Sequence, residues 1–365
     1  MSTYSVAIIG TGPDPNHPTV ESFAMGYRHA EAYRSEERCE IVACCDVVPE
    51  NAAAFADEFD VPDDGVFEDY ERMLSTVEPD LVSVCVPPDI HVAIVVGCAE
   101  SGAVEGIHCE KPMANTIVGA RRMVEVCDRE GVQLTFNRQR RFGKPFTEAK
   151  RLLDEGTIGD LRRVEIGWGD FFDTGAHTVD LAGKFNDEHH AEWVIGQLDY
   201  REEDLRFGTH QENQMWAQWR YENGVYGAIS TGEGDDFVPA AFALRGTEGD
   251  ILIDVDDGPM LAIDSGGDRT AIDVDGETLH NTPDEAGRFG SRYHDRAVAE
   301  IVDALETGGE SELRGELGLK TAEIIFAGYE SVRRRGRVEA PVDVDDNPLV
   351  AMVEDGLLTP APAND

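Results

Sequence analysis

Strand-like and helix-like patterns of apolar residues alternate through the first third of the chain. The opening run, residues 4–10, is apolar and β-branched and ends in a glycine, which is typical of a buried strand. A helix-like spacing begins near Ser22, and the next strand-like run, residues 40–46, ends in an aspartate. The alternation continues with strands predicted at 81–86, 104–109 and 132–136 and helices predicted at 52–59, 90–101 and 116–130. Such repeats predict a parallel sheet that binds its ligand at the carboxyl ends of the strands.

After Phe136 the pattern becomes that of a mostly antiparallel sheet followed by helices. Short apolar runs are joined by turn residues such as Glu222-Asn223-Gly224, which is a hairpin signal. Strands are predicted at 162–168, 193–200, 214–221, 225–231, 239–245, 249–255 and 259–264, and helices at 146–154, 291–307 and 315–334. The change of pattern predicts two domains, and a length of 365 residues agrees with that number.

A glycine turn, Gly10-Thr11-Gly12, follows the first strand directly. A strand followed by such a turn is where a dinucleotide pyrophosphate meets the N-terminus of a helix, because glycines let the backbone approach the phosphates. The third glycine of the fingerprint is missing from its usual place, and residues 13–25, which contain three prolines, intervene. Gly26 is the candidate for the displaced third glycine, used for close packing of helix on strand.

Asp46 is the acidic residue expected at the end of the second strand of such a fingerprint. Its distance from Gly10 is longer than usual, and the inserted loop accounts for the excess. Asp46 is expected to accept hydrogen bonds from the adenosine ribose hydroxyls and to repel a 2′-phosphate, so NAD is favoured and NADP stays open. The alternative is that the two glycines only make a tight turn and that Asp46 caps the next segment.

The predicted fold class is therefore α/β. Residues 1–136 are expected to form an N-terminal Rossmann domain with a parallel sheet that binds NAD(P). Residues 137–353 are expected to form a C-terminal α+β domain with a mostly antiparallel, open sheet for substrate binding and oligomerisation. The acidic, proline-containing residues 354–365 are expected to be a frayed tail.

The charge of the chain excludes one class of partner. The formal net charge is -42, from 73 acidic residues against 31 lysines and arginines, and only five of these are lysines. Phosphate backbones are repelled by such a surface, so we expect no nucleic-acid partner. The self-repulsion is relieved only where salt screens it, which indicates a halophilic protein adapted to a salt-filled cytoplasm.

The cysteines and the apolar segments indicate a reduced, cytoplasmic protein. None of the seven cysteines falls in a C-x-x-C pair, which argues against a disulfide framework and a zinc site. His189-His190 has no partners at metal-ligand spacing, so no metal is expected. The first residues do not form a signal peptide, and no apolar run reaches the roughly 20 residues that span a membrane.

Two further groups of residues follow predicted strands at the ligand edge of the sheet. Val86, Pro87 and Pro88 come at the end of one strand, and Glu110, Lys111 and Pro112 follow another. Val86, Pro87, Pro88, Glu110 and Lys111 are therefore candidate cofactor contacts, together with Gly10, Thr11, Gly12 and Asp46. His91 opens the helix after the two prolines, and a cofactor contact and a structural role are both open for it.

These motifs resemble the glucose–fructose oxidoreductase and inositol dehydrogenase family, often called Gfo/Idh/MocA. The resemblance covers nearly the whole chain and rests on the G-T-G turn, VPPDIH at 86–91, EKP at 110–112, GTIGDLRRV at 156–164, DTGAHTVD at 173–180, RGTEGDI at 245–251 and the segment 317–338. It implies a dehydrogenase that transfers a hydride between NAD(P) and a sugar, sugar acid or cyclitol. It also implies that the open sheet face supports homodimers or homotetramers. The inserted loop and the short, glycine-poor segment before Asp173 depart from the family pattern, which leaves substrate identity open.

Within this resemblance, Lys111, Asp173 and His177 are the candidate catalytic residues. The Lys111 ammonium is expected to stabilise a developing alkoxide, and its alternative is a surface lysine in an ion pair. His177 is the general base, because an imidazole titrates near neutral pH. Asp173, four residues earlier on the same helical face, is expected to orient His177 or to bind the substrate, with Asp180 as a second candidate. The alternative is that Asp173 caps the helix and His177 is a core residue.

Several residues and activities keep two interpretations. The arginines at 138–141 either reach the nicotinamide or an anionic substrate group, or pair with the many acids. Trp193, Trp216 and Trp219 are expected in the core or on a sheet face, and a platform for stacking a sugar is the alternative. Besides a dehydrogenase acting on a small polyol, the resemblance allows glycosidic-bond cleavage with transient oxidation by bound NAD, and a non-catalytic nicotinamide or sugar sensor.

Overall fold

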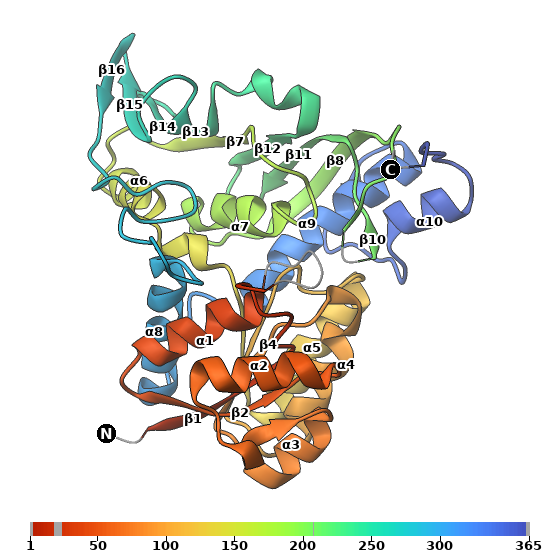
Figure 1. Ribbon diagram of the computed structural model, residues 1–365. Helices are drawn as coiled ribbons and strands as arrows, with labels where there is room; N and C mark the ends of the chain where they lie inside the picture. The colour runs from red at the N-terminus through yellow and green to blue at the C-terminus, as the bar shows by residue number, and fades with distance from the viewer. Residues whose placement is uncertain (1–2, 18–23, 207, 363–365) are drawn as a thin grey trace. The chain divides into compact units, whose positions relative to one another are not determined.

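The structure, a computed structural model, describes residues 3–17, 24–206 and 208–362. Backbone contacts divide the chain into two units (Figure 1). The first contains Met1–Ala114, Gly119–Gln139 and Asp284–Glu316, and the second contains Asn115–Val118, Arg140–Pro283 and Leu317–Asp365. The sequence had placed residues 284–316 in the C-terminal domain. They group with the first unit because α8 (Arg292–Thr307) buries Val298 and Val302 in the hydrophobic core of that unit.

The first unit is built around a parallel sheet of six strands in the described residues, in the order β3-β2-β1-β4-β5-β6. This confirms the predicted alternation of strands and helices. The predicted helix start near Ser22 lies outside the described residues. The elements are β1 (Tyr4–Ile9), α1 (Met25–Ser35), β2 (Cys39–Cys45), α2 (Pro49–Phe59), β3 (Val66–Phe67), α3 (Tyr70–Val77), β4 (Leu81–Val84), α4 (Pro88–Glu100), β5 (Gly106–Cys109), α5 (Ile117–Glu130) and β6 (Gln133–Phe136).

One hydrophobic core cluster of the first unit lies between the sheet and helices α1, α2 and α8. Val6 and Ile8 of β1 are completely buried there. The ring of Tyr27 on α1 packs edge-on against Phe55 of α2 at a centroid distance of 5.2 Å. Burial of aromatic and branched side chains is the main favourable contribution to folding, and it fixes α1 against the sheet. The helix that follows the glycine turn is thus rigidly placed.

The second unit carries a sheet of nine strands in the described residues, in the order β16-β15-β14-β13-β7-β12-β11-β8-β17. β12 pairs with β7 in parallel, and the other neighbours in the described sheet run antiparallel, as the sequence predicted. The strands are β7 (Leu161–Ile166), β8 (Ala191–Asp199), β11 (Gln214–Tyr221), β12 (Tyr226–Ser230), β13 (Ala240–Gly246), β14 (Asp250–Val255), β15 (Leu261–Ser265), β16 (Asp268–Ala271) and β17 (Val338–Glu339), with a separate hairpin of β9 (Leu205–Arg206) and β10 (Thr209–His210).

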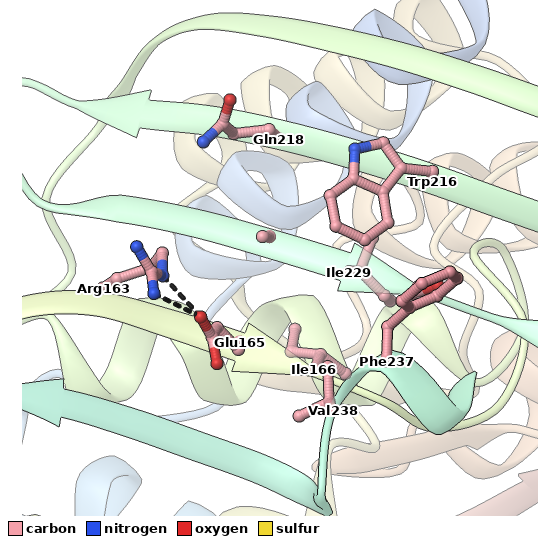
Figure 2. Close-up of a pocket in the computed structure, with 10 residues that line it drawn as sticks. Arg163, Glu165, Ile166, Trp216, Gln218, Ile229, Phe237 and Val238 are labelled. Atoms are coloured by element: carbon pink, nitrogen blue, oxygen red, sulfur yellow. Dashed lines mark hydrogen bonds and ion pairs between the residues drawn. The ribbon is translucent and has the colours of Figure 1, made fainter. Parts of the chain in front are cut away.

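The two faces of this second sheet differ in exposure. Alternate residues of β11, such as Met215 and Trp219, are completely buried. The helices of this unit are α6 (Lys144–Asp154), α7 (Gly175–Phe185), α9 (Gly315–Arg334) and α10 (Pro348–Glu354). The intervening residue Trp216 is 47% exposed and contacts Phe237, which is 74% exposed, with ring centroids 6.1 Å apart (Figure 2). The sheet therefore has an open face with apolar side chains on it, and the tryptophans lie in the core or on this face, as predicted.

The described part of the C-terminal segment, which ends at residue 362, is held more firmly than the sequence suggested. Residues 354–365 were expected to be frayed, but the backbone N–H of Ala361 donates to the carbonyl oxygen of Arg201 at 2.7 Å, and that of Glu203 donates to Ala361 at 2.8 Å. Within the described residues, no helix is long and apolar enough to cross a membrane.

Candidate active site

In the turn after β1, Gly10 is packed too closely for a side chain, and both glycines have a positive φ. Gly10 has a φ of 84° and Gly12 one of 70°, a region that side chains disfavour. A Cβ on Gly10 would lie 2.7 Å from Cγ1 of Val86 and 2.8 Å from the carbonyl oxygen of Cys85. A Cβ on Gly26 would lie 2.8 Å from the carbonyl oxygen of Gly10, so Gly26 provides the predicted close packing of α1 on the turn. This cradle fits a dinucleotide pyrophosphate.

Asp46, at the end of β2, holds the glycine turn in place. Its Oδ2 accepts hydrogen bonds from the backbone N–H of Gly12 at 2.9 Å and from the Thr11 hydroxyl at 3.1 Å. Its Oδ1 accepts from the backbone N–H of Val48 at 2.9 Å. The carboxylate therefore lies at the glycine turn, and its bond to Val48 is a local turn rather than a cap, because α2 has no side-chain cap hydrogen bond.

His91 joins the ends of two neighbouring strands. The side chain is fully buried on α4. Its Nε2 lies 2.8 Å from the carbonyl oxygen of Val86, after β4, and its Nδ1 lies 3.0 Å from the carbonyl oxygen of Pro112, after β5. Burial lowers the pKa of His91. These contacts support the structural role for His91, while Pro87 and Pro88 form the start of α4.

Lys111 directly follows β5 and Glu110. The Glu110 carboxylate, a candidate cofactor contact, is buried in the first unit, where its Oε1 accepts hydrogen bonds from Nε2 of His29 and Nδ2 of Asn137, both at 2.7 Å. Its Oε2 accepts from the backbone N–H of Lys111 at 3.1 Å. Nδ1 of His29 lies 2.7 Å from the hydroxyl of Ser83 on β4. The backbone of Lys111 is thus hydrogen-bonded to a buried polar network.

In the second unit, His177 is buried on α7, but Asp173 does not share a helical face with it. α7 begins at Gly175 after the N-cap residue Thr174, so Asp173 precedes the helix. The carboxylate of Asp170 accepts from the backbone N–H of Asp173 at 2.6 Å and from that of Thr174 at 3.0 Å, and so holds Asp173 in a turn before the helix. The N-cap residue Thr174 makes no side-chain capping hydrogen bond, so Asp173 does not cap α7, and the Asp170 carboxylate holds only the turn before the helix.

A buried carboxyl group supports the loop that leads to Asp173. Glu212 accepts a hydrogen bond from the backbone N–H of Phe171 at 2.7 Å and another from the hydroxyl of Tyr329 at 2.5 Å. Burial, and then the charge of Asp170, raise the pKa of Glu212 to about 7. Burial, and then the charge of Asp173, also raise the pKa of Asp170. The loop before α7 is thus surrounded by carboxyl groups that are costly to ionise.

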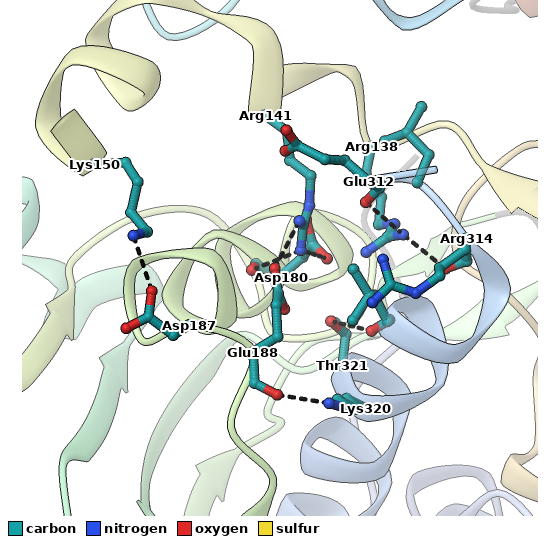
Figure 3. Close-up of polar contacts among 12 residues, drawn as sticks. Arg138, Arg141, Lys150, Asp180, Asp187, Glu188, Glu312, Arg314, Lys320 and Thr321 are labelled. Atoms are coloured by element: carbon teal, nitrogen blue, oxygen red, sulfur yellow. Dashed lines mark hydrogen bonds and ion pairs between the residues drawn. The ribbon is translucent and has the colours of Figure 1, made fainter. Parts of the chain in front are cut away.

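The arginines that follow β6 have three different environments. Arg141 is buried and binds Asp180 through Nε at 2.6 Å and Nη2 at 2.8 Å, and it also binds Glu188 at 2.8 Å (Figure 3). This is the predicted ion-pair alternative, and it assigns Asp180 to Arg141 as a structural partner. Arg138 donates to the carbonyl oxygen of Arg314 at 3.0 Å.

Arg140 remains a candidate for contact with an anionic group. Its guanidinium lies over the ring of Trp168 at 4.5 Å. Burial lowers the pKa of Arg140 to about 10, although the charges of Asp173 and Asp170 oppose this. Arg140 therefore lies near Asp173, which was predicted from the sequence to be catalytic.

Sequence reasoning missed four residues of these networks, namely His29, Asn137, Asp170 and Glu212. Each is a common surface residue type, and its signal is a partner far away in the chain: His29 and Glu110 are 81 positions apart. Only Asp170 had a local signal, because an aspartate that accepts from the backbone N–H groups three and four residues later is typical of a turn. Among the described residues, no group of three His, Cys, Asp or Glu side chains is arranged to hold a metal.

Comparison with known proteins agrees with this geometry. Residues 5–138 match the GFO/IDH/MocA model, described as an oxidoreductase family with an NAD-binding Rossmann fold. The chain is 30% identical over 281 residues to the D-glucoside 3-dehydrogenase of Escherichia coli, which covers 69% of this chain and 74% of that protein. It is 24% identical over 336 residues to the myo-inositol 2-dehydrogenase of Thermotoga maritima, which covers 86% and 95%. A levoglucosan dehydrogenase solved with NADH and L-sorbose has the same fold, with a TM-score of 0.75 at 19% identity over 94% of this chain and 100% of that one.

Proposed function

Because the chain belongs to the GFO/IDH/MocA family of NAD-binding oxidoreductases, we propose that it is an NAD-dependent dehydrogenase of a small polyol. The substrate class is a sugar, a sugar acid or a cyclitol, and the reacting group is a hydroxyl that becomes a carbonyl. NAD is preferred to NADP because a carboxylate, Asp46, lies at the glycine turn, where it repels a 2′-phosphate.

One observation of the first unit carries the proposal. A continuous series of contacts links the cofactor turn to the position after Lys111: Gly10 packs against Val86, the Val86 carbonyl contacts His91, and His91 contacts the Pro112 carbonyl. β1, β4 and β5 are neighbours in a parallel sheet, so their carboxyl ends meet at one edge. A lysine at that edge, beside the dinucleotide cradle, suits a reaction at the nicotinamide end of the cofactor.

The three candidate side chains divide the work of the oxidation. When bound, NAD accepts the hydride that leaves the hydroxyl-bearing carbon. An imidazole nitrogen of His177 takes the proton of the same hydroxyl, so that the substrate loses two electrons and two hydrogens and a carbonyl forms. The Lys111 ammonium stabilises the negative charge that develops on the oxygen. Asp173, which precedes α7, hydrogen-bonds the substrate or orients His177.

The test of this reaction is NAD reduction by the purified protein with a panel of aldoses, cyclitols and sugar acids. We expect stoichiometric NADH and ketone product with one of these classes. His177→Asn is expected to lose turnover most strongly where the imidazole would be neutral, which flattens the pH profile of kcat. NAD that binds but is never reduced in net amount would instead support cleavage with transient oxidation, or a sensor.

We further propose that the open face of the second sheet binds a second copy of the chain. Its support is the exposed apolar pair of Trp216 and Phe237 on that face, together with Ile195, which is 43% exposed on the neighbouring strand. Light scattering of the purified protein at high salt is expected to give a dimer or tetramer. Trp216→Glu is expected to lower the mass to that of a monomer.

A further inference from the structure

The backbone around Lys111 is held on both sides by buried groups of the first unit. Before it, Oε2 of Glu110 accepts the hydrogen bond of the Lys111 backbone N–H at 3.1 Å. After it, the Pro112 carbonyl oxygen lies 3.0 Å from the fully buried His91. The position of the Lys111 backbone therefore depends on how firmly Glu110 and His91 are held. His91 is part of a helix, so the question is what fixes the Glu110 carboxylate.

The Glu110 carboxylate is fixed by two elements that are distant in the chain. Its Oε1 accepts from Nε2 of His29, on α1, and from Nδ2 of Asn137, just after β6, each at 2.7 Å. Glu110 is 5% exposed, and His29 and Asn137 are each 1% exposed. A carboxylate at this depth is tolerated only when it is paired and hydrogen-bonded, so both donors are needed to keep it there.

The charge of this cluster lies on His29 and Glu110. Burial disfavours the imidazolium of His29, but the Cys85 sulfur and the Glu110 carboxylate outweigh burial and raise the pKa of His29. Burial likewise disfavours the Glu110 carboxylate, but the hydrogen bond from His29 and the charge of Lys111 outweigh it and lower the pKa of Glu110. His108 stacks on His29 with ring centroids 5.0 Å apart, and burial and the charge of His29 lower its pKa. The buried ion pair of His29 and Glu110 thus lies beside His108, whose imidazolium is disfavoured.

We propose that His29 and Asn137 are positioning residues, which hold Lys111 at the carboxyl end of β5 through the Glu110 carboxylate. The inference rests on the catalytic role proposed for Lys111 and extends it to residues that do not touch the substrate. His29 lies one helical turn after Gly26 on the same side of α1, and Gly26 packs against the glycine turn. The helix that begins at the cofactor cradle therefore also carries the residue that positions the lysine.

The kinetic test uses His29→Gln, Glu110→Gln and the double variant. Each single change removes the ion pair and leaves a polar side chain of similar size. We expect kcat to fall about 100-fold, the cost of a misplaced catalytic group, with little change in KM for NAD. The double variant is expected to be no worse than the poorer single variant, because both changes break the same connection. His108→Gln is the matched control: it removes a histidine from the same buried cluster, whose hydrogen bond is to Thr135, and is expected to leave kcat near the wild-type value.

A second readout does not depend on turnover. The chain has only five lysines, so ¹³C-methylation of the lysines gives few NMR signals, and the signal lost in Lys111→Arg identifies Lys111. We expect the Lys111 signal to move in His29→Gln and Glu110→Gln and to stay in place in His108→Gln. A Lys111 signal that stays in place in the folded His29→Gln and Glu110→Gln variants overturns the proposal.

The outcomes separate this proposal from the proposed function. If Lys111→Ala keeps its turnover, the catalytic role of Lys111 is wrong, and the NMR signals still decide whether His29 positions it. If His29→Gln does not fold, Asn137→Ala takes its place, because it removes one donor and leaves the ion pair. Asn137→Ala is then expected to move the Lys111 signal, and an unmoved signal overturns the proposal.

Discussion

The buried carboxyl group of Glu212 makes a quantitative prediction about stability and pH. The side chain is 4% exposed. Burial and the charge of Asp170 raise its pKa from the ordinary value of 4.5 to about 7, despite the hydrogen bonds from Phe171 and Tyr329. Since one pH unit of such a difference corresponds to about 1.4 kcal/mol, ionised Glu212 lowers the free energy of unfolding by about 3 kcal/mol above pH 7.

The sign follows from proton uptake. The pKa is higher in the folded protein, so between pH 4.5 and about 7 the folded state binds more protons than the unfolded chain, and this contribution to stability falls as the pH rises. Glu212→Gln removes the titration and keeps an acceptor for the Phe171 N–H. The free energy of unfolding of Glu212→Gln, relative to wild type, is therefore expected to rise by about 3 kcal/mol across this window and to level off above it.

The assay is urea unfolding at several pH values in constant, high KCl, with both proteins measured side by side. Glu37→Gln changes an exposed glutamate and is the control, for which the difference from wild type is expected to be small at every pH. A Glu212→Gln difference that stays constant between pH 4.5 and 7 would refute the reasoning, because Glu212 would then titrate alike in both states.

Three other predictions concern packing, cofactor binding and salt. Arg141→Leu removes the buried arginine that pairs with Asp180, so the free energy of unfolding is expected to fall by about 4 kcal/mol in urea, and Arg141→Leu/Asp180→Leu to recover most of it; an equally unstable double variant would contradict this. Gly26→Ala places a methyl group 2.8 Å from the Gly10 carbonyl oxygen and is expected to weaken NAD binding about tenfold in calorimetry, whereas Gly336→Ala, with no atom within 4 Å, keeps the wild-type Kd. Raising KCl from ~0.1 M to ~2 M is expected to raise Tm, because salt screens a net charge of -42; a Tm that stays constant argues against halophilic adaptation.

Elements with a strong apolar pattern were predictable from the sequence. α9 (Gly315–Arg334) and β11 (Gln214–Tyr221) have the predicted bounds, because the spacing of their apolar residues along the chain can be recognised from the sequence alone. α3 (Tyr70–Val77) was missed, because it is a short helix started by the Asp69 cap rather than by a long apolar stripe. The pattern of α8 shows that one face is buried but not against which core, so its place in the first unit could not be predicted.

The candidate site was predictable where chemistry follows a strand end. Gly10, Asp46 and Lys111 could be singled out because the end of a parallel strand is recognisable locally. The ion pair of His29 and Glu110 could not, because its partners come from different elements and neither has a local signal. For Asp173, the predicted helical spacing failed because the Asp170 carboxylate holds Asp173 in a turn just before α7.

The most direct test of the central claim compares NADH formation by the wild type and by Lys111→Ala. Both proteins are given NAD and the panel of aldoses, cyclitols and sugar acids in ~2 M KCl, and NAD binding is measured by calorimetry. The account predicts turnover by the wild type, and for Lys111→Ala an unchanged Kd for NAD with a kcat at least about 100-fold lower. Undiminished turnover by Lys111→Ala would contradict the account.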